Sequence, residues 1–459
     1  MLDGSETVRF SVFGRTHDLC LTSPGSYGVL KGRLARGKMK ISAIKGFSDI
    51  FPGEVETWQL VEKKAREVFA AYNFSEIRIP ILEKTELFSR SIGETTDIVE
   101  KEMYTFADQD VKGSLLTLRP EGTAGVVRAY IESEMYKIEP VRKLYYMGPM
   151  FRRERPQKGR MRQFHQIGAE VLGRGDPFID AEVLLLLRDF FSAVGLEGIV
   201  LELNSLGCVE CRPKYRESLL AFLKQREVTL CDNCRRRMER NPLRVLDCKE
   251  QGCIAETQKA PSILNSLCGL CREHFEFVQR LLLQANVTSI LNPRMVRGLD
   301  YYCRTTFEWT SNQLGSQNAV AAGGRYDGLV QDLGGPSIPG VGFAMGIERL
   351  ILLLRAKGSS EPEGPSLYIV WVGQKARDWA FPVVHRLRQK GLSVEMEGEE
   401  RSLKSRMRRA DKLKAASVLI VGDDELIKGT VVLRDMASKH QEEISLEHIE
   451  AELMSRKAS

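Results

Sequence analysis

The sequence predicts an α+β fold, in which a helical insertion interrupts an antiparallel sheet core and a small α/β domain follows. Short strand-like runs, separated by turns and basic loops, recur before residue 357. A charged, cysteine-rich helical stretch from Cys208 to Cys271 breaks that pattern, and strands alternate with helices after residue 366. Because 459 residues exceed what one hydrophobic core organises, several domains are expected.

Composition excludes several classes of protein. Hydrophobic residues at 43% and charged residues at 28% are typical of a soluble globular protein rather than a disordered or membrane one. Apolar runs such as Val183–Leu187 and Leu350–Leu354 are too short to span a bilayer. The net charge of +6 permits a polyanionic partner without requiring one. Ten cysteines in so long a chain do not indicate a secreted disulfide scaffold, so we expect a reducing cytoplasm.

The first 38 residues differ from the rest. Residues 1–38 contain scattered Gly, Ser and Thr without a helical period, and they lack the apolar stretch of a signal peptide. Asp3 and Glu6 argue against a transit peptide, which is poor in acidic residues. We interpret this segment as an upstream extension of uncertain structure and expect the true start at Met39.

The core is expected in two parts, residues 39–206 and 291–356, on either side of an insertion at 207–290. Apolar residues at helical spacing predict a helix over Val55–Tyr72. Glu76–Leu82 is predicted as a strand in which Pro80 requires an edge or interface position, because proline cannot donate to a ladder. The other expected strands are Leu115–Leu118, Lys143–Met147, Gln166–Val171, Thr305–Trp309 and Gly340–Phe343.

A second domain is expected over residues 366–459. Residues 357–365 have the Gly, Ser, Pro and Glu composition of a linker. The elements expected after it alternate between strand and helix, which predicts a small α/β domain. They are strands Leu367–Val372, Leu392–Met396 and Val418–Val421, with helices near Ala376–Lys390 and Ser402–Ala415.

The segment Phe151–Gln166 concentrates positive charge. Five arginines lie between Arg152 and Arg162, with Glu154 as the only acidic residue among them. Planar guanidinium groups grip phosphate oxygens bidentately, so two strands joined by this loop suit a polyphosphate. The flanking Phe151 and Phe164 could stack a base, whereas the alternative is a solvated basic loop.

Three other segments carry candidate chemistry. Leu118–Thr123 is a turn whose role is as readily structural as functional. Arg297–Tyr302 joins a cation to two aromatic rings. In Gly340–Leu350, small residues let a strand and a helix approach a ligand closely, with Arg349 at the start of the helix. A glycine-rich turn of this kind occurs in many unrelated folds.

Together these segments resemble the three motifs of class II aminoacyl-tRNA synthetases, specifically histidyl-tRNA synthetase. The segment through Pro80 is similar to motif one, Phe151–Gln166 to motif two and Gly340–Leu350 to motif three. Arg297–Tyr302 and Ala322–Gly328 distinguish the histidine member of the class. The resemblance covers the chain after the extension.

The resemblance implies a ligase that activates L-histidine with ATP and Mg²⁺ to histidyl-adenylate. It then transfers histidine to tRNA(His), releasing AMP and diphosphate. The family is dimeric through motif one, so a homodimer is implied, and the α/β domain resembles an anticodon-binding domain. The insertion is expected to contact the acceptor arm of the tRNA.

Residue roles also follow from the resemblance. Arg152 and Arg297 are the implied catalytic residues, because a fixed cation stabilises the charge that builds when a carboxylate attacks the α-phosphate. No general base is needed, and His165 is interpreted as structural. The implied ATP-binding residues are Arg152, Glu154, Arg160, Phe164 and Arg349; the implied histidine-binding residues are Glu121, Thr123, Gln166, Glu170, Tyr301, Tyr302 and Tyr326.

Histidine selectivity has a physical basis. Neutral imidazole offers one donor and one acceptor. A buried polar pocket that matches this pair penalises competitors by roughly 10⁴–10⁵ in comparable sites, so no editing domain is expected.

Basic residues crowd the helix expected near Ser402–Ala415. Leu403, Met407 and Ala410 are interpreted as its buried stripe. The charges indicate either a solvated face or, given the resemblance, phosphate contacts to tRNA. They are Arg401, Lys404, Arg406, Arg408, Arg409, Lys412 and Lys414.

Eight of the ten cysteines lie in the insertion. Three C-x-x-C pairs, at Cys208, Cys231 and Cys268, occur together with Cys248 and Cys253, and these spacings suit thiolate ligation of zinc. Reduced buried thiols and facultative disulfide pairing are the alternatives, and the sequence alone assigns no metal here.

Two other functions compete with this interpretation. One is the synthetase-like regulatory subunit of ATP phosphoribosyltransferase, a relative that lacks the anticodon domain and degrades the catalytic arginines. Here Arg152, Arg297, Arg349 and the tail domain are all present. The other is a class II synthetase for a different amino acid, which would lack the Arg297–Tyr302 run.

Overall fold

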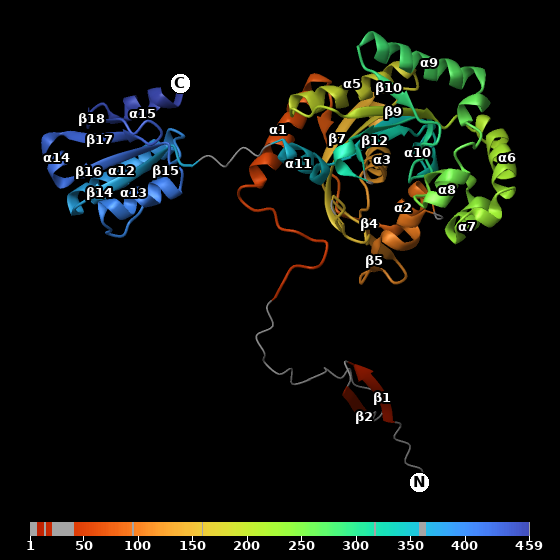
Figure 1. The fold of residues 1–459 in the computed structure, drawn as a ribbon, viewed down its shortest axis with the longest axis horizontal. Coiled ribbons are helices and arrows are strands. Elements are labelled where there is room, and N and C mark those ends of the chain that lie inside the picture. The colour runs from red at the N-terminus through yellow and green to blue at the C-terminus, as the bar shows by residue number, and fades with distance from the viewer. Residues whose placement is uncertain are drawn as a thin grey trace. The chain divides into compact units, whose positions relative to one another are not determined.

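The computed structural model describes residues 7–12, 15–20, 41–93, 96–157, 159–315, 318–357 and 364–458. Met39 and most of the expected linker at 357–365 lie outside these residues. Within the extension, β1 (Thr7–Val12) and β2 (Arg15–Cys20) pair as an antiparallel hairpin, in a unit of its own that spans Met1–Ile44 (Figure 1).

An eight-stranded sheet forms the centre of the core, in the order β10-β9-β11-β12-β13-β8-β7-β3 (Figure 1). The pairings from β9 to β7 are antiparallel, and only the two edge strands β10 and β3 pair in parallel. The α+β prediction is therefore confirmed. The strands are β3 (Ser75–Glu76), β7 (Arg142–Phe151), β8 (Gln163–Leu172), β9 (Val200–Ser205), β10 (Ser289–Leu291), β11 (Cys303–Thr310), β12 (Ala319–Arg325) and β13 (Gly340–Gly346).

Helices cover one face of this sheet and make the largest hydrophobic core. Trp58, Val61, Ala65 and Phe69 of α1 are buried, as their helical spacing predicts. The apolar run of α5 is buried on several sides because this helix packs between α1 and α9. The covering helices are α1 (Val55–Ala71), α5 (Pro177–Ala193), α9 (Gly269–Gln284) and α11 (Ile347–Ala356).

The opposite face carries the polar residues. In β8, Ile167 and Ala169 belong to the large core, whereas Gln166 and Glu170 alternate with them. Because successive side chains of a strand point to opposite faces, both polar residues face away from that core. Smaller elements flank this face: α2 (Thr85–Ile92), a π-helix at Ile98–Glu102, α3 (Thr123–Glu132), α4 (Met135–Ile138), α10 (Leu329–Asp332), and a sheet of β4 (Leu82–Lys84), β6 (Leu115–Leu118) and β5 (Tyr104–Ala107).

The expected strand at Glu76–Leu82 is divided. Residues 77–81 lie between β3 and β4 and belong to neither strand. The guanidinium group of Arg119 donates to the carbonyl oxygens of Ile79 and Pro80, at 2.8 and 3.3 Å. At Ile79 and Pro80 a side chain therefore replaces a neighbouring strand as the hydrogen-bond partner, because Pro80 offers no N–H. Backbone hydrogen bonds remain on either side, from Ile77 N–H to Tyr145 and from Arg119 N–H to Ile81.

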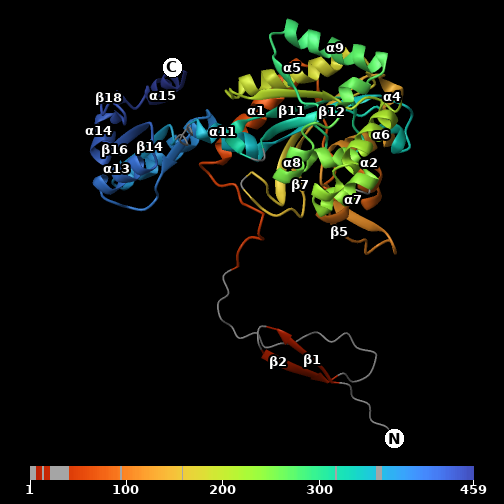
Figure 2. The same ribbon diagram turned by 45° about the vertical axis from the view of Figure 1, so that its right-hand side comes forward.

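The insertion is helical and has its own small core. Its helices α6, α7 and α8 lie together beside the sheet in both views (Figures 1 and 2). Four of the thirteen buried residues of that core are cysteines. The elements are α6 (Cys211–Lys224), α7 (Asp232–Arg240) and α8 (Gln251–Glu256), with short 3₁₀ turns at Glu227–Thr229, Pro242–Asp247, Ile263–Ser266 and, in the core, Asn312–Leu314.

The C-terminal domain is a five-stranded mixed sheet in the order β15-β14-β16-β17-β18. β14 is buried on both faces: Ile369 packs toward α12, and Tyr368 packs toward α13. Among the described residues, no helix has both the length and the apolarity to cross a bilayer. The elements are β14 (Leu367–Val372), α12 (Gln374–Gln389), β15 (Val394–Met396), α13 (Leu403–Lys412), β16 (Ser417–Gly422), α14 (Asp423–Lys428), β17 (Thr430–Asp435), β18 (Gln441–Ser445) and α15 (Ile449–Ala458).

Two expectations for α13 are wrong. Arg406 is not on the charged surface but is 1% exposed, and its guanidinium carbon lies 3.7 Å from the centre of the Trp371 ring. Its donors satisfy the carbonyl oxygens of Trp371 and Glu399, which explains why a cation is buried here. Leu403, expected in the buried stripe, is exposed at the first turn of the helix.

Candidate active site

A cavity of about 240 Å³ opens on the polar face of the large sheet. Its wall combines the start of α3, the loop between β7 and β8, the strands β8, β12 and β13, the start of α11 and the loop before β11. Eleven of the thirteen site residues expected from the sequence line it: Glu121, Thr123, Arg152, Glu154, Arg160, Phe164, Gln166, Arg297, Tyr301, Tyr302 and Arg349. The remaining two, Glu170 and Tyr326, are buried beside Thr123.

Cations from distant segments share this cavity. Arg152 and Arg160 come from the loop between β7 and β8, and Arg349 comes from the first turn of α11. Burial lowers the pKa of Arg349, and the charges of Arg160 and Arg152 lower it further. Glu154 offsets this charge in part, through an ion pair with Arg160. Such crowding of like charges is typical of a site that receives a polyanion.

Arg152 links two of the segments singled out in the sequence. Its Nε donates to the carbonyl oxygen of Pro120 at 2.9 Å, which attaches the Leu118–Thr123 turn to the basic loop. Its guanidinium carbon lies 5.2 Å from the centre of the Phe164 ring. The loop therefore presents a cation and an aromatic face to the same cavity.

Arg297 lines the same cavity and is held there by contacts of its own. It forms an ion pair with Glu308 of β11, and its guanidinium carbon lies 5.7 Å from the centre of the Tyr302 ring. Burial by itself would lower the pKa of Arg297, but the charge of Glu308 and the nearby tyrosines raise it. The group therefore stays a cation inside the protein.

A hydrogen-bonded polar pocket adjoins the cations. The carboxyl group of Glu170 accepts from the hydroxyls of Tyr326 at 2.5 Å and Thr123 at 2.7 Å. Burial raises the pKa of Glu170 to about 8, although these hydrogen bonds lower it. Glu121 accepts from the backbone N–H groups of Thr123 and Ala124 at 2.6 and 2.9 Å, at the start of α3.

A glycine of the sheet makes room for this pocket. A Cβ atom on Gly342 would lie 1.8 Å from a carboxylate oxygen of Glu170, so the glycine of β13 leaves the space that this carboxyl group occupies.

Within the described part of the chain, the buried Oε1 of Gln166 has no hydrogen-bond partner. A buried acceptor without a partner is costly, and a donor supplied by a ligand would satisfy it.

Family models match nearly the whole described chain after the extension. A model described as histidyl-tRNA synthetase matches residues 46–350, and one described as an anticodon binding domain matches residues 366–456. The chain belongs to the histidyl-tRNA synthetase family.

Relatives within this family are similar over nearly their full lengths. The histidine–tRNA ligase of Syntrophotalea carbinolica is 54% identical over 418 residues, which cover 91% of this chain and 99% of that protein. That of Geobacter sulfurreducens is 58% identical over 407 residues, covering 88% and 97%. The structure of apo S. aureus histidyl-tRNA synthetase superposes with a TM-score of 0.76 at 34% identity, covering 90% of this chain and 100% of that one.

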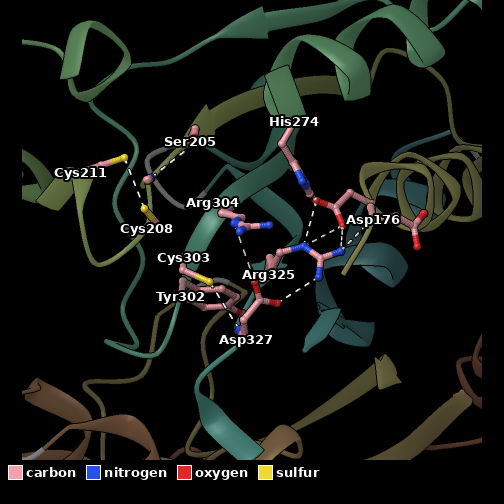
Figure 3. Close-up of polar contacts among 12 residues, drawn as sticks. Asp176, Ser205, Cys208, Cys211, His274, Tyr302, Cys303, Arg304, Arg325 and Asp327 are labelled. Carbon is pink, nitrogen blue, oxygen red and sulfur yellow. Dashed lines mark hydrogen bonds and ion pairs between the residues drawn. The ribbon is translucent and has the colours of Figure 1, made fainter. Parts of the chain in front are cut away.

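One part of the family resemblance lies away from the cavity. Arg325, from the Ala322–Gly328 run, is fully buried and pairs with the equally buried Asp180 of α5. Figure 3 shows Arg325 between His274 and Asp327. The same carboxylate bonds His274 of α9 at 2.7 Å, and Arg325 also reaches Asp327 at 3.0 Å. This network connects β12 to two helices, so Arg325 supports the site without lining it.

Sequence reasoning also missed Arg119 and Tyr146. Arg119 donates to the carbonyl oxygens of Pro149, Ile79 and Pro80, and so joins the turn before α3 to β7. The ring of Tyr146 packs directly against Gly122, where an added Cβ atom would lie 2.2 Å from the ring. Arg119 stands in the quoted Leu118–Thr123 turn, but nothing in the sequence distinguishes its structural role from ligand binding.

His165 fits the structural interpretation. Its Nδ1 lies 3.0 Å from Glu348, and its ring packs edge-on against Trp58 at 5.0 Å between centroids. Both contacts hold α1 and α11 against β8.

Proposed function

We propose that this protein activates L-histidine with ATP and transfers it to tRNA(His). One observation carries the proposal: Arg152, Arg160, Arg297 and Arg349, drawn from three separate segments, line one cavity. Such a constellation suits the α-, β- and γ-phosphates of one nucleotide.

The first step needs charge stabilisation rather than proton transfer. A carboxylate oxygen of histidine attacks the α-phosphorus of ATP, the bond to the β-phosphate oxygen breaks, and diphosphate leaves. Arg152 and Arg297 would stabilise the negative charge that builds at the α-phosphate. Because a carboxylate is already ionised at neutral pH, no general base is required.

The remaining nucleotide contacts are assigned to the basic loop and to α11. Arg160 and Arg349 would bind the outer phosphates, Glu154 the adenine amino group, and Phe164 the face of the ring. Glu348 at the cavity and Glu308 next to it offer the oxygen ligands that Mg²⁺ prefers. A Mg²⁺ ion bound with ATP would neutralise part of the phosphate charge.

Histidine would occupy the adjoining polar pocket. Glu121, Thr123 and the unpaired Oε1 of Gln166 would accept from the α-ammonium group. Glu170, Tyr302 and Tyr326 would pair with the imidazole, with Tyr301 packing at 4.6 and 5.7 Å between its ring centroid and theirs. In the second step a hydroxyl of the tRNA attacks the histidyl carbonyl carbon and AMP leaves.

The domains would have separate roles in catalysis and in tRNA binding. Residues 39–206 and 291–356 would form the catalytic core, 207–290 the insertion that contacts the acceptor arm, and 366–459 the anticodon-binding domain, after the linker at 357–365. In α13 and beside it, Arg401, Lys404, Arg408, Arg409 and Lys412 are exposed, which suits phosphate contacts. A cytoplasmic location accords with a role in translation and with the free cysteines between residues 208 and 303.

A homodimer is proposed through the segment around Pro80. Ile81, Leu82, Phe106 and Leu115 leave 43, 39, 46 and 50% of their surfaces exposed on or beside the small β4-β6-β5 sheet. Clustered apolar exposure of this kind marks an interaction surface. Light scattering coupled to size exclusion should give twice the 51.8 kDa chain mass, and a monomer would overturn the dimer.

Amino-acid-dependent exchange of pyrophosphate into ATP tests the activity. Exchange with histidine alone is expected. Exchange with another amino acid would indicate a different class II specificity. Absence of exchange with every amino acid, together with histidine binding, would favour the regulatory alternative.

A further inference from the structure

We propose that the insertion binds two structural zinc ions. Cys208, Cys211, Cys268 and Cys271 would hold one ion, and Cys231, Cys234, Cys248 and Cys253 the other. In each set all four sulfur atoms lie within 4.8 Å of one another. The eight cysteines thus divide into two complete groups of four, with no insertion cysteine left over.

The separations of the sulfur atoms fit one small ion at the centre of each group. Zn–S bonds of about 2.3 Å in a tetrahedron place neighbouring sulfurs about 3.8 Å apart. The Sγ of Cys208 lies 3.6 Å from that of Cys211 and 3.9 Å from that of Cys268. In the second group, the sulfurs of Cys231 and Cys248 are 3.9 Å apart. Figure 3 shows the Cys208 and Cys211 sulfurs directed toward one another.

Backbone N–H groups support the thiolates in the same way at both sites. The N–H of Cys268 donates to Cys211 Sγ, and the N–H of Cys231 donates to Cys253 Sγ, each at 3.2 Å. Such bonds orient metal-bound sulfur and stabilise its negative charge. In both cases the donor belongs to one cysteine pair and the acceptor to the other, so each site joins two separate pieces of chain.

Other uses of the cysteines fit less well. Disulfides would bring sulfurs together in twos at about 2.05 Å and would not require four within mutual reach. An iron–sulfur cluster places several metal and sulfide atoms between its ligands, which would spread them farther than 4.8 Å. Four thiolates around one tetrahedral position suit a single zinc ion; a single iron ion has the same geometry, so metal analysis distinguishes the two.

The two sites are nested. The first connects residues 57 positions apart, at the starts of α6 and α9, and the second connects residues 22 apart between them. Domains of this size bury little apolar surface and commonly need a metal or disulfide to be stable. The core here is correspondingly small and includes Cys211, Cys234, Cys253 and Cys271.

Both sites hold residues that contact the loop carrying Arg297. Arg212, which follows Cys211, donates to the carbonyl oxygen of Tyr302. Arg244, between Cys234 and Cys248, donates to the carboxylate of Asp300 at 2.8 Å. We therefore assign the ions a positioning role for residues 297–302. That role rests on the proposed function, whereas zinc binding itself does not.

Metal content of the full chain tests the sites directly. The protein would be purified without a histidine tag under reducing conditions, dialysed against metal-free buffer and analysed by plasma mass spectrometry. Two zinc ions per chain are expected, falling to one in the Cys208→Ser/Cys211→Ser variant and to one in Cys231→Ser/Cys234→Ser. Cys303→Ser, a cysteine of the core outside both groups, is the matched control and should retain two.

Spectroscopy on the wild-type chain avoids variants that fail to fold. After exchange of the metal for Co²⁺, thiolate-to-cobalt charge transfer and the d–d bands of a tetrahedral all-sulfur site are expected. Freely titrating thiols without metal, disulfides found by mass spectrometry, or bound iron would each overturn the assignment. A single zinc ion abolished by either double variant would overturn the two-site arrangement.

Hydrogen exchange tests the positioning role. Removing zinc with a mercurial and a chelator, then reducing the thiols, should increase amide exchange in residues 297–302 while leaving β16 of the C-terminal domain unchanged. Unchanged exchange in 297–302 would overturn the positioning role. Because exchange and metal content are measured without substrates, neither result depends on catalytic activity.

Discussion

The guanidinium group of Arg297 is paired with the carboxylate of Glu308, which belongs to β11. The pair holds the guanidinium group in one position at the cavity. This fixed position suits the proposed role of Arg297, because a cation that is positioned in advance stabilises a developing charge without reorganisation.

Replacing Arg297 tests that role. Arg297→Ala should lower histidine-dependent pyrophosphate exchange by about 10²–10³, the usual effect of removing one donor to a developing charge. Arg155→Ala removes an exposed arginine of the basic loop that does not line the cavity, and should leave exchange unchanged. Circular dichroism would check that both variants fold. Full activity in Arg297→Ala would remove its assignment.

The ionisation of Glu170 predicts a pH dependence of histidine binding. Its pKa is raised from 4.5 to about 8, so the free protein holds this carboxyl group protonated near neutrality. Pairing with a substrate donor favours the carboxylate, so binding should release a proton. Histidine affinity should then rise between pH 7 and pH 8, by up to about tenfold per unit, and level off above.

Calorimetry in buffers of different ionisation enthalpy would measure both the affinity and the proton release. Glu170→Gln cannot ionise, so its weaker affinity should be flat across the same pH window. The folding stability of the free chain depends on pH in the opposite direction to histidine affinity. Because the pKa of Glu170 is raised in the folded state, its contribution to stability is lost as the pH rises from 4.5 to about 8. A wild-type affinity independent of pH would contradict the assignment.

Gly342 should tolerate no side chain. A methyl group there would lie 1.8 Å from a Glu170 oxygen, so Gly342→Ala must displace that carboxyl group or the strand. We expect a loss of about 1–3 kcal/mol in the free energy of unfolding and a markedly higher KM for histidine. Thermal melts and exchange kinetics would measure the two effects. Gly398→Ala, where nothing lies within 4 Å, is the control and should change neither.

Two arginines of α13 should behave differently. Arg406→Ala leaves the carbonyl oxygens of Trp371 and Glu399 without this donor and opens a space beside the indole. The C-terminal domain should therefore lose about 2–4 kcal/mol of stability. The exposed Arg408 should instead affect tRNA affinity and the slope of its salt dependence, with little change in melting temperature.

Melting curves and filter binding at several salt concentrations would compare the two variants. Equal effects on stability would contradict the buried role of Arg406. An unchanged salt slope in Arg408→Ala would show that this residue makes no phosphate contact.

Residue patterns predicted the elements best where periodicity was strong. The helix expected over Val55–Tyr72 ends one residue earlier, at Ala71, and Leu367–Val372 is a strand with the expected bounds. Prediction was poorest near Pro80, because Arg119 replaces a strand partner through contacts distant in sequence. Likewise, the sequence predicted Arg406 on the charged surface, because its contact with the distant Trp371 forms only in the folded domain.

The sequence by itself determined the kinds of chemistry available: arginines in a loop between strands, small residues where a strand and a helix can approach a ligand, and cysteines at metal-binding spacings. These are local properties of composition and period. Only the tertiary structure decided which groups share a space, because the register of the antiparallel sheet brings β8, β12 and β13 together. That register gathers Arg152, Arg297 and Arg349 around one cavity and places Arg325 in a buried ion pair, while the packing of the helical insertion sorts eight cysteines into two sets of four.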